Sequence, residues 1–410
     1  HWHDGDALGV DGSAALDADA GLQALSVSVR SDALAAVGER YLSGWLGLAG
    51  LTGLDLGGAL SADVDIAATG LQRLDARLQQ VPLRGPQGRS AFDATDGDLP
   101  FLAATVAGTR TPIDSALRWR GGALYGLDFG PAQWQLRSEQ GMLRLREPVA
   151  IAMLDGEVRF DPMTLRPPHD GEGLQMEFGL HLDEPDVGAL AKALDWPAFR
   201  GSLSGSIPSA RYANDRLDFD GGLSMQVFDG RIDVSALSME RPFGVAPTLS
   251  SDLVLHDLGL LAITEVFDFG SISGRLDGRI DALRLVDWKA TAFDARLQTE
   301  RRRGTRQRIS QRAVQNISSV GDASFVTSLQ GQLIGLFDDF GYRRIGIGCR
   351  LLNEVCGMSG LHSAGQGFTI VQGAGIPRLN VVGFNRDVDW PTLLERLAAV
   401  AGGEVAPVID

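Results

Sequence analysis

Cys349 and Cys356 are the only cysteines in this 410-residue chain, and their type and spacing point to definite chemistry. Six residues separate them, and Leu352 and Asn353 fall at the centre of a tight turn, so the two sulfurs could face each other across a hairpin. Closing so short a loop is worth about 2.5 kcal/mol in the chain-entropy model. Two buried free thiols are the alternative, whereas zinc would need two further ligands, and His362 is the only nearby candidate. The pair therefore predicts a disulfide.

The other polar residues show no catalytic pattern. His169, His181 and His256 are scattered with no nucleophile motif around them, and the chain has neither a Gly-x-Ser-x-Gly elbow nor a phosphate-binding P-loop. Asp218 and Asp220 lack the spacing and the closing glutamate of a calcium loop. We therefore expect a protein that is not an enzyme and that uses no metal and no cofactor.

Positive charge is concentrated in one run that contains no acidic residue, formed by Arg301, Arg302, Arg303, Arg306, Arg308 and Arg312. The first four arginines could contact lipid phosphates or an anionic membrane surface. A solvated face or a flexible connector is the alternative. The whole chain has 37 basic and 52 acidic residues, a net charge of -15, which argues against nucleic acid as a partner.

The elements that must position these residues are mainly short strands. One segment places its apolar side chains at odd-numbered positions, namely Leu217, Phe219, Leu223, Met225 and Val227. The residues between them are polar, so the segment has one apolar and one polar face. Residues 186–194 and 258–267 have the spacing of short amphipathic helices. Residues 82–100, rich in Pro, Gly, Asp and Ser, predict a loop.

Part of this pattern occurs twice, about 74 positions apart. An Asp-Gly turn with alternating apolar residues starts at Leu154 and again at Phe228. A Gly-x-Leu-x-Gly-x-Ile strand follows each copy, from Gly201 to Ile207 and from Gly274 to Ile280. Both units are typical of β-hairpins. A unit that cannot bury its own apolar face must stack on its neighbours, so the repeat predicts an elongated, mainly β structure built on an extended sheet.

The last part of the chain has a different character and predicts an α+β capping module over residues 301–410. We expect short helices over 310–318 and 325–340, and a final helix that Asp389 caps at its N-terminus. A β-repeat region over 1–150 and the hairpin repeats over 151–300 precede this module. No apolar run is long enough for a membrane-spanning helix. Because the chain starts at His1 rather than Met, we expect that an N-terminal portion with any anchor is missing.

Several segments resemble the C-terminal portion of the YdbH branch of the AsmA-like envelope proteins, which are relatives of TamB. In the module these segments are Arg308–Val314, Phe340–Gly346, Cys349–Gly360, Gly375–Arg378, Gly383–Asn385 and Val388–Trp390. Upstream they are Gly201–Arg211, Phe228–Ile232 and Phe269–Arg275. The resemblance is specific over roughly residues 150–400.

The resemblance implies a bridge-like protein in the periplasm of a Gram-negative bacterium, anchored in the inner membrane by an N-terminal segment. It implies an elongated, curled β-sheet that forms a hydrophobic groove. Phospholipid would move along this groove between the inner and outer membranes, with its acyl chains as the bound ligand. The resemblance further implies a small outer-membrane lipoprotein that extends the sheet edge. It does not indicate the direction of transport, the headgroup preference or the energy source.

Together, the alternation and the resemblance predict which side chains contact acyl chains: Leu203, Ile207, Leu217, Phe219, Leu223, Met225, Val227, Leu276 and Ile280. An alternating apolar face can also be covered by a second sheet, by helices or by closure into a barrel. Two other functions fit the same pattern. One is an outer-membrane protein assembly factor that holds nascent barrel strands, and the other is a structural or adhesive β-solenoid.

Overall fold

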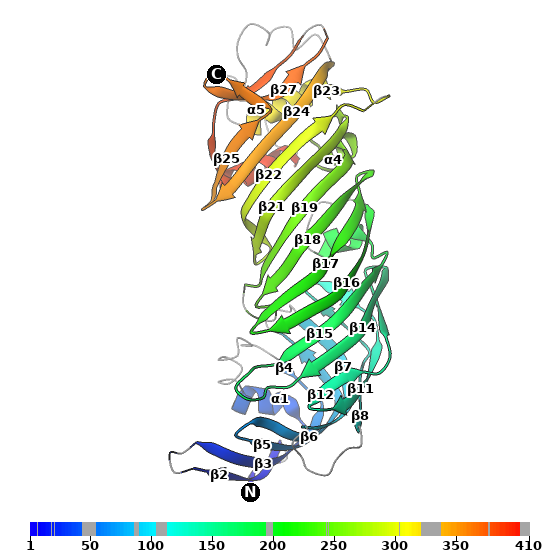
Figure 1. Cartoon of the computed structure of the whole chain (residues 1–410), viewed down its shortest axis with the longest axis vertical. Coiled ribbons are helices and arrows are strands. Elements are labelled where there is room, and N and C mark those ends of the chain that lie inside the picture. Colours follow the sequence, from blue (N-terminus) through cyan, green and yellow to red (C-terminus); the bar gives the residue numbers. More distant parts are fainter. Residues whose placement is uncertain are drawn as a thin grey trace. The chain divides into compact units, whose positions relative to one another are not determined.

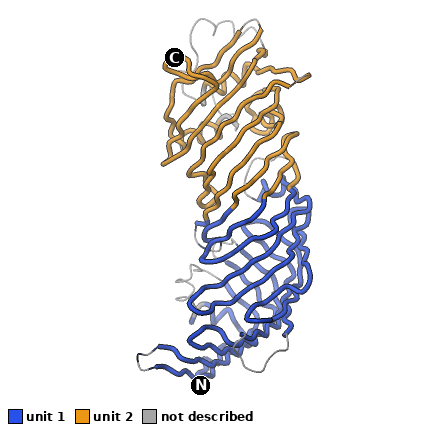
Figure 2. The backbone as a smooth tube through the Cα atoms, in the orientation of Figure 1, with its two compact units in different colours: residues 1–195, 204–221, 238–247 blue, residues 196–203, 222–237, 248–410 orange. Residues whose placement is uncertain are grey.

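The fold is that of a computed structural model, which describes residues 1–5, 7–17, 19, 21–42, 55–85, 90–103, 113–193, 200–242, 244, 246–302, 304–320, 338–375 and 378–401. These residues form antiparallel strands with a few short helices (Figure 1). The predicted mainly β fold is therefore confirmed. The chain divides into two compact units (Figure 2): unit 1 contains residues 1–195, 204–221 and 238–247, and unit 2 contains residues 196–203, 222–237 and 248–410.

Unit 1 is largely an antiparallel meander, in which most strands that follow one another in sequence lie side by side. Its strands are β1 (Trp2–Asp4), β2 (Leu8–Leu16), β3 (Leu22–Ser31), β4 (Asp55–Leu56), β5 (Ala59–Ala67), β6 (Gly70–Arg84), β7 (Ser90–Leu102), β8 (Ile113–Trp119), β9 (Gly121–Leu124), β10 (Leu127–Phe129), β11 (Ala132–Glu139), β12 (Met142–Leu145), β13 (Val149–Met153), β14 (Gly156–Arg166) and β15 (Gln175–Asp183). Its helical segments are α1 (Leu34–Val37), the π-helical turn η1 (Gly38–Leu42) and α3 (Val187–Ala193). Some strand pairings skip one or two strands, because β3 also pairs with β5, β7 with β9, β8 with β11, β10 with β13 and β12 with β14.

Three strands have residues in both units: β16 (Gly201–Ala213), β17 (Arg216–Val227) and β18 (Gly230–Glu240). Unit 2 contains the strands β19 (Thr248–Gly259), β20 (Ile272–Ser273), β21 (Arg275–Val286), β22 (Lys289–Glu300), β23 (Arg308–Ser310), β24 (Asp339–Leu352), β25 (Val355–Gly360), β26 (His362–Ala364), β27 (Gly367–Gly373), β28 (Val381–Gly383) and β29 (Asp387–Asp389). Its helices are α4 (Leu260–Val266), α5 (Gln311–Val320) and α7 (Trp390–Ala401).

Strand β24 organises unit 2, because it is long enough to pair with four other strands. Its first residues pair with β23, the next with β27, and its last part lies between β22 and β25. Strand β22 also pairs with β21, which pairs with β19. Strands β24 and β25 therefore continue the sheet of β19, β21 and β22 within one compact unit.

Two-residue turns with positive φ at both central positions join many of these strands, as is typical of type I′ hairpins. They are Tyr125–Gly126, Gln140–Gly141, Leu154–Asp155, Asn214–Asp215, Phe228–Asp229, Asp287–Trp288 and Asn353–Glu354. The predicted centres of three of these turns were wrong by one residue. Asp-Gly was predicted at the centre of the two repeated turns, and Leu352–Asn353 at the centre of the cysteine hairpin.

The glycines of the two repeated Asp-Gly pairs are required by strand packing rather than by the turns. Gly156 and Gly230 are the first residues of β14 and β18. A Cβ atom on Gly156 would lie 2.6 Å from the backbone nitrogen of Pro185, and one on Gly230 would lie 2.6 Å from the carbonyl oxygen of Asp257. Both copies of the repeat therefore keep glycine because the neighbouring backbone comes too close for a side chain.

Three β-bulges in the sheets have the same hydrogen-bonding arrangement. Gln80, Asp257 and Ala282 have positive φ, and each lies where the strand register shifts. Their backbone N–H groups donate to an aspartate of the adjacent strand: Gln80 to Asp96 at 2.9 Å, Asp257 to Asp277 at 2.9 Å and Ala282 to Asp252 at 2.7 Å. Bulges bend and twist a strand, so these aspartates stabilise sheet curvature. The hydrogen bond from Gln80 lowers the pKa of Asp96.

The predicted loop over residues 82–100 is wrong, because residues 82–84 end β6 and residues 90–100 belong to β7. In β7 the side chains of Asp93 and Asp98 are exposed, whereas Phe92 is half-buried and Phe101 is buried. The polar composition therefore belongs to the exposed side of a strand that bulges at Ala94. Most of the predicted helix over 325–340 lies outside the described residues, but Phe340 is in β24.

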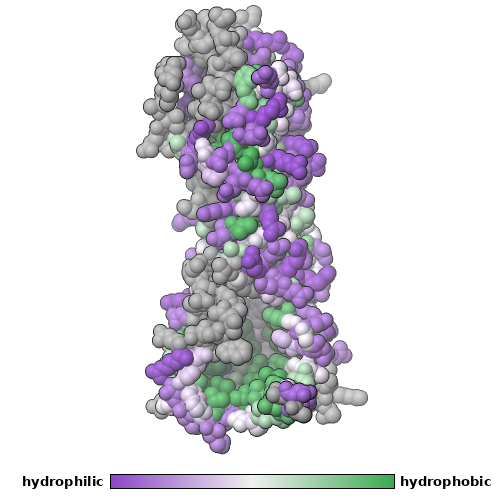
Figure 3. Space-filling model, turned by 90° about the vertical axis from the view of Figure 1, so that its left-hand side faces the viewer, coloured by the Kyte–Doolittle hydropathy of each residue, from purple (hydrophilic) through white to green (hydrophobic). Residues whose placement is uncertain are grey.

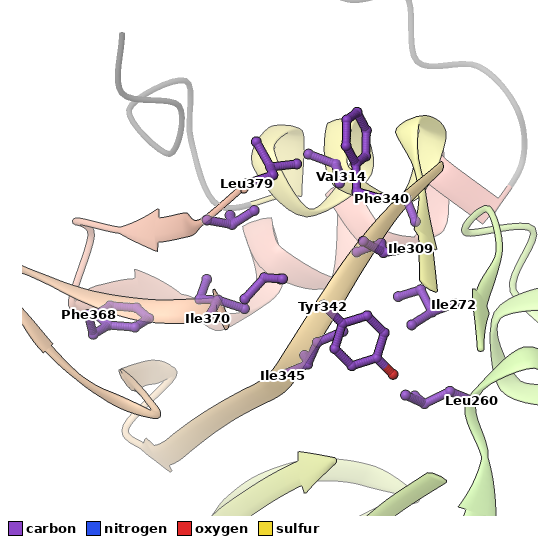
Figure 4. Packing of buried hydrophobic residues seen from close by; sticks show 13 residues of the cluster. Leu260, Ile272, Ile309, Val314, Phe340, Tyr342, Ile345, Phe368, Ile370 and Leu379 are labelled. Atoms are coloured by element: carbon purple, nitrogen blue, oxygen red, sulfur yellow. The ribbon is translucent and has the colours of Figure 1, made fainter. Parts of the chain in front are cut away.

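The other helix predictions are confirmed by α3, α4, α5 and α7. At the start of α7 the carboxylate of Asp389 accepts the backbone N–H of Thr392 at 2.9 Å and its hydroxyl at 2.6 Å, which lowers the pKa of Asp389. The hydrophobic cluster of unit 2 joins α4 and α5 to β20, β23, β24 and β27 (Figure 4). In that cluster the ring of Tyr342 lies near Leu260, Ile272 and Ile345.

Candidate hydrophobic binding face

The pairing register of unit 1 places apolar side chains opposite apolar side chains from strand to strand. Val64 of β5 lies opposite Leu74 of β6, and Leu74 lies opposite Phe101 of β7. Farther along the meander the same face contains the opposite pairs Leu117–Trp134, Val149–Phe160, Val158–Leu182 and Met163–Phe178. Unit 1 therefore presents one continuous apolar face, which we call the apolar face of unit 1.

A row of aromatic rings crosses this face. It consists of Phe92 (β7), Trp119 (β8), Phe129 (β10), Trp134 (β11), Phe160 (β14) and Phe178 (β15). Neighbouring centroids lie 5.2 Å apart for Phe92–Phe129, 5.7 Å for Trp119–Trp134, 5.5 Å for Trp134–Phe160 and 5.7 Å for Phe160–Phe178. Contacts of this kind contribute about 0.5–1.5 kcal/mol each beyond area burial. The aromatic row could not be predicted from the sequence, because its six members are spread over 86 positions of the chain, from 92 to 178.

Much of the apolar face of unit 1 is only half-buried. Trp134, Phe160 and Phe129 are in this class, whereas Trp119 is 7% exposed and Phe178 is 8% exposed. Hydrophobic side chains surround a hollow with hydrophilic rims in the lower part of Figure 3, over strands of unit 1. A fully packed core would leave these rings almost inaccessible. The hollow is therefore a candidate binding surface for an apolar ligand.

The sheet of unit 1 curls enough to bring strands that are distant in the meander into contact. Gly70 at the start of β6 forms an antiparallel bridge with His169, which follows β14. The N–H of Asp170 donates to the carbonyl oxygen of Thr69 at 2.8 Å. These bonds join the turn before β6 to the loop before β15, so one corner of the curled sheet is held by backbone hydrogen bonds.

The opposite face of the unit 1 sheet is covered by ion pairs. Asp114 accepts from Arg137 at 2.9 Å and from Arg146 at 3.1 Å, and Arg118 lies 3.5 Å from Asp96. Hydrogen bonding to Arg137 lowers the pKa of Asp114. These pairs are exposed and contribute little to stability. They make this face of the sheet hydrophilic, whereas the opposite face is apolar.

The predicted contact residues on β16 and β17 have the alternation that the sequence indicated. Leu203, Ile207 and Val227 are buried. The remaining ones on β17 are half-buried, namely Leu217, Phe219, Leu223 and Met225. Their neighbours Asp218, Asp220 and Gln226 are exposed. Ile207 lies opposite Leu180 of β15, which connects it to the apolar face of unit 1.

The predicted contact residues on β21 belong to unit 2. Ile280 lies opposite Leu253 of β19 on one side and Ala295 of β22 on the other, so it continues an apolar face across three strands. Leu276 packs against the hydrophobic cluster shown in Figure 4. Both side chains are half-buried. The structure therefore places Leu276 at the margin of a packed core and Ile280 on the sheet.

Cys349 and Cys356 are joined in a disulfide, with their Cα atoms 5.5 Å apart. They are diagonal neighbours rather than opposite residues, because Cys349 pairs with Met358 and Cys356 pairs with Leu351. The shift follows from the turn, which is centred one residue later than the sequence suggested. Cys356 is fully buried.

The arginine run is partly neutralised by ion pairs within unit 2. Arg302 lies 3.2 Å from both Asp257 and Asp277, and Arg312 lies 2.6 Å from Asp268. Arg301 and Arg306 are exposed, and Arg303 lies outside the described residues. Of the four arginines proposed to contact phosphate, Arg302 is thus already held by carboxylates.

Two further findings concern the described part of the chain. It contains no helix that combines the length and apolar character needed to span a bilayer. It also brings no three His, Cys, Asp or Glu side chains together as metal ligands. Comparisons with protein-family models, with curated proteins and with solved structures found no match.

Proposed function

We propose that this protein is a conduit in which the acyl chains of phospholipids lie along the apolar sheet faces. The observation that carries the proposal is the apolar face of unit 1, because four of the six rings in its aromatic row are half-buried and its opposite face carries ion pairs. Such a surface needs an apolar occupant, because leaving large rings in water forgoes the free energy of burial.

The chemistry of this face suits a ligand that is held and yet able to slide. Each methylene removed from water stabilises the bound lipid by about 0.8 kcal/mol, without any specific polar contact. Sliding along such a face breaks no hydrogen bond. The hydrophilic rims of the hollow would leave a phosphate headgroup in water while the acyl chains lie inside.

We place this conduit in the periplasm of a Gram-negative bacterium, between the inner and outer membranes. The resemblance to the YdbH branch of the AsmA-like proteins supports this location, and so does the disulfide, because such bonds persist in oxidising compartments. In this proposal the full-length protein is anchored in the inner membrane and a small outer-membrane lipoprotein extends the sheet edge.

Photo-crosslinking in living cells tests the proposal. A photoreactive amino acid replaces the half-buried Phe219 in one variant and its exposed neighbour Asp218 in a matched control. We expect phospholipid adducts from position 219, found by mass spectrometry, and few or none from position 218. Adducts from position 219 to nascent outer-membrane proteins would instead indicate an assembly factor. Adducts to neither lipid nor protein would favour a structural β-solenoid, and either result would overturn the conduit.

A further inference from the structure

Unit 2 contains a cavity of about 210 Å³ between its sheet and two helices. The sheet supplies one wall, and α5 and α7 supply the other. Its lining residues are Phe269, Ala295, Leu297, Ile317, Ile347, Cys349, Met358, Ile370, Val388, Leu393 and Leu397.

The chemistry of this lining is uniform. The lining side chains are aliphatic or aromatic, apart from the disulfide sulfur of Cys349 and the thioether of Met358. None of them offers a charge or a strong hydrogen-bond donor. Water needs two to four polar partners to occupy a cavity, so this one disfavours water. A void of this kind also loses dispersion contacts that a ligand would restore.

The cavity has a route to solvent beside α7. Leu393 is 8% exposed and closes the interior, whereas Leu397, one turn later, lines the cavity and is 38% exposed. A small movement of Leu397 would therefore admit a ligand without unfolding the sheet. The wall on the other side is fixed, because the Cys349–Cys356 disulfide ties β24 to β25 under the same helix.

We propose that this cavity binds one small hydrocarbon group, such as a benzene ring or a short alkyl chain. An apolar cavity of roughly 150 Å³ is large enough to bind benzene, and this one is larger. The site can be tested separately from the lipid conduit, because its lining lies beneath α5 and α7 of unit 2, whereas the crosslinking position 219 lies on β17.

Benzene is the probe for the test, used with the full chain. Wild-type protein with labelled methyl groups is titrated with benzene, and we expect saturable shifts of the Ile317, Leu393 and Leu397 methyl resonances. Saturating benzene is also expected to raise the Tm of wild type by roughly 2 °C. Absence of both effects in the wild type overturns the proposal without any mutation.

Two matched variants locate the site. Ala295→Leu places three extra carbons in the cavity and should abolish the benzene shift, whereas Ala292→Leu, on the same strand but outside the lining, should retain it. Unchanged benzene binding by Ala295→Leu would overturn the proposal. Photo-crosslinking of lipid from position 219 should be the same in Ala295→Leu as in wild type, so failure of this site and failure of the conduit give different results.

Discussion

The phenol of Tyr342 donates a hydrogen bond to the backbone carbonyl of Ser273 at 2.7 Å, in the core of unit 2. Tyr342 comes from β24 and Ser273 from β20, so one side chain ties the long strand of unit 2 to the segment that follows α4. The contact depends on the next residue, Gly274, because a Cβ atom there would overlap the phenolic oxygen.

Replacing Gly274 with alanine should destabilise unit 2. Its φ of +149° is strained for other residues, and the added methyl group would displace the Tyr342 hydroxyl. We expect the free energy of unfolding to fall by more than about 1 kcal/mol, measured by urea titration. Gly375→Ala is the matched control, since Gly375 also has positive φ but has no atoms near its Cβ position. Equal losses in the two variants would contradict the role assigned to Tyr342.

Tyr342 also predicts a pH dependence. Burial raises the pKa of Tyr342 above its usual value near 10, so the folded state holds its proton more tightly than the unfolded state. This contribution to stability is complete below about pH 10 and is lost as the pH rises further. Tyr342→Phe should lower stability by about 1 kcal/mol at pH 7. The variant should then lose less stability than wild type between pH 10 and higher pH; parallel losses would show that Tyr342 is not the titrating group.

The corner of unit 1 at Gly70 offers a test of sheet curling. A Cβ atom on Gly70 would lie 2.7 Å from the carbonyl oxygen of Pro168, and its φ is +113°. Gly70→Ala should therefore break the bridge to His169 and speed hydrogen exchange at Asp170. Gly171→Ala is the control, because Gly171 has a φ of +81° and free space around it. Slow exchange at Asp170 in Gly70→Ala would mean that the corner is held in another way.

Removing the disulfide should destabilise the hairpin that lies under α7. Cys349→Ala combined with Cys356→Ala is expected to lower the free energy of unfolding by about 2.5 kcal/mol, since the closed loop is short. Urea unfolding with and without a thiol reductant provides the measurement. Reductant should shift the wild-type midpoint and leave that of the double variant unchanged. If the reductant left the urea midpoint of the wild type unchanged, the prediction would be contradicted.

Intrinsic fluorescence can report whether the aromatic row meets acyl chains. Phospholipids with brominated acyl chains should quench the tryptophan fluorescence of the wild type, because Trp119 and Trp134 lie in that row. Trp119→Phe combined with Trp134→Phe should lose most of the quenching. Trp2→Phe, which removes a tryptophan that is 46% exposed on β1, should retain it. Equal quenching in all three proteins would place the lipid elsewhere.

The sequence by itself determined the local features of this protein. Alternation at Leu217 and Phe219 predicted a strand with one apolar face, since side chains on a strand point to opposite sides in turn. The cap at Asp389 and the spacing in α3 and α4 are likewise local, because they depend on residues within one or two turns of a helix. The prediction of a loop over residues 82–100 was wrong because it relied on polar composition, and the bulge at Ala94 interrupts the alternation that would have indicated a strand.

Only the tertiary structure decided which faces meet. Pairing register brings Trp134 beside Phe160 and Phe160 beside Phe178, and neither contact is encoded within any single strand. Bulges at Gln80 and Ala282 change that register, so spacing along the chain does not give the partner across the sheet. The cavity beneath α7 has the same origin, since its lining comes from segments between positions 269 and 397 that touch only after folding.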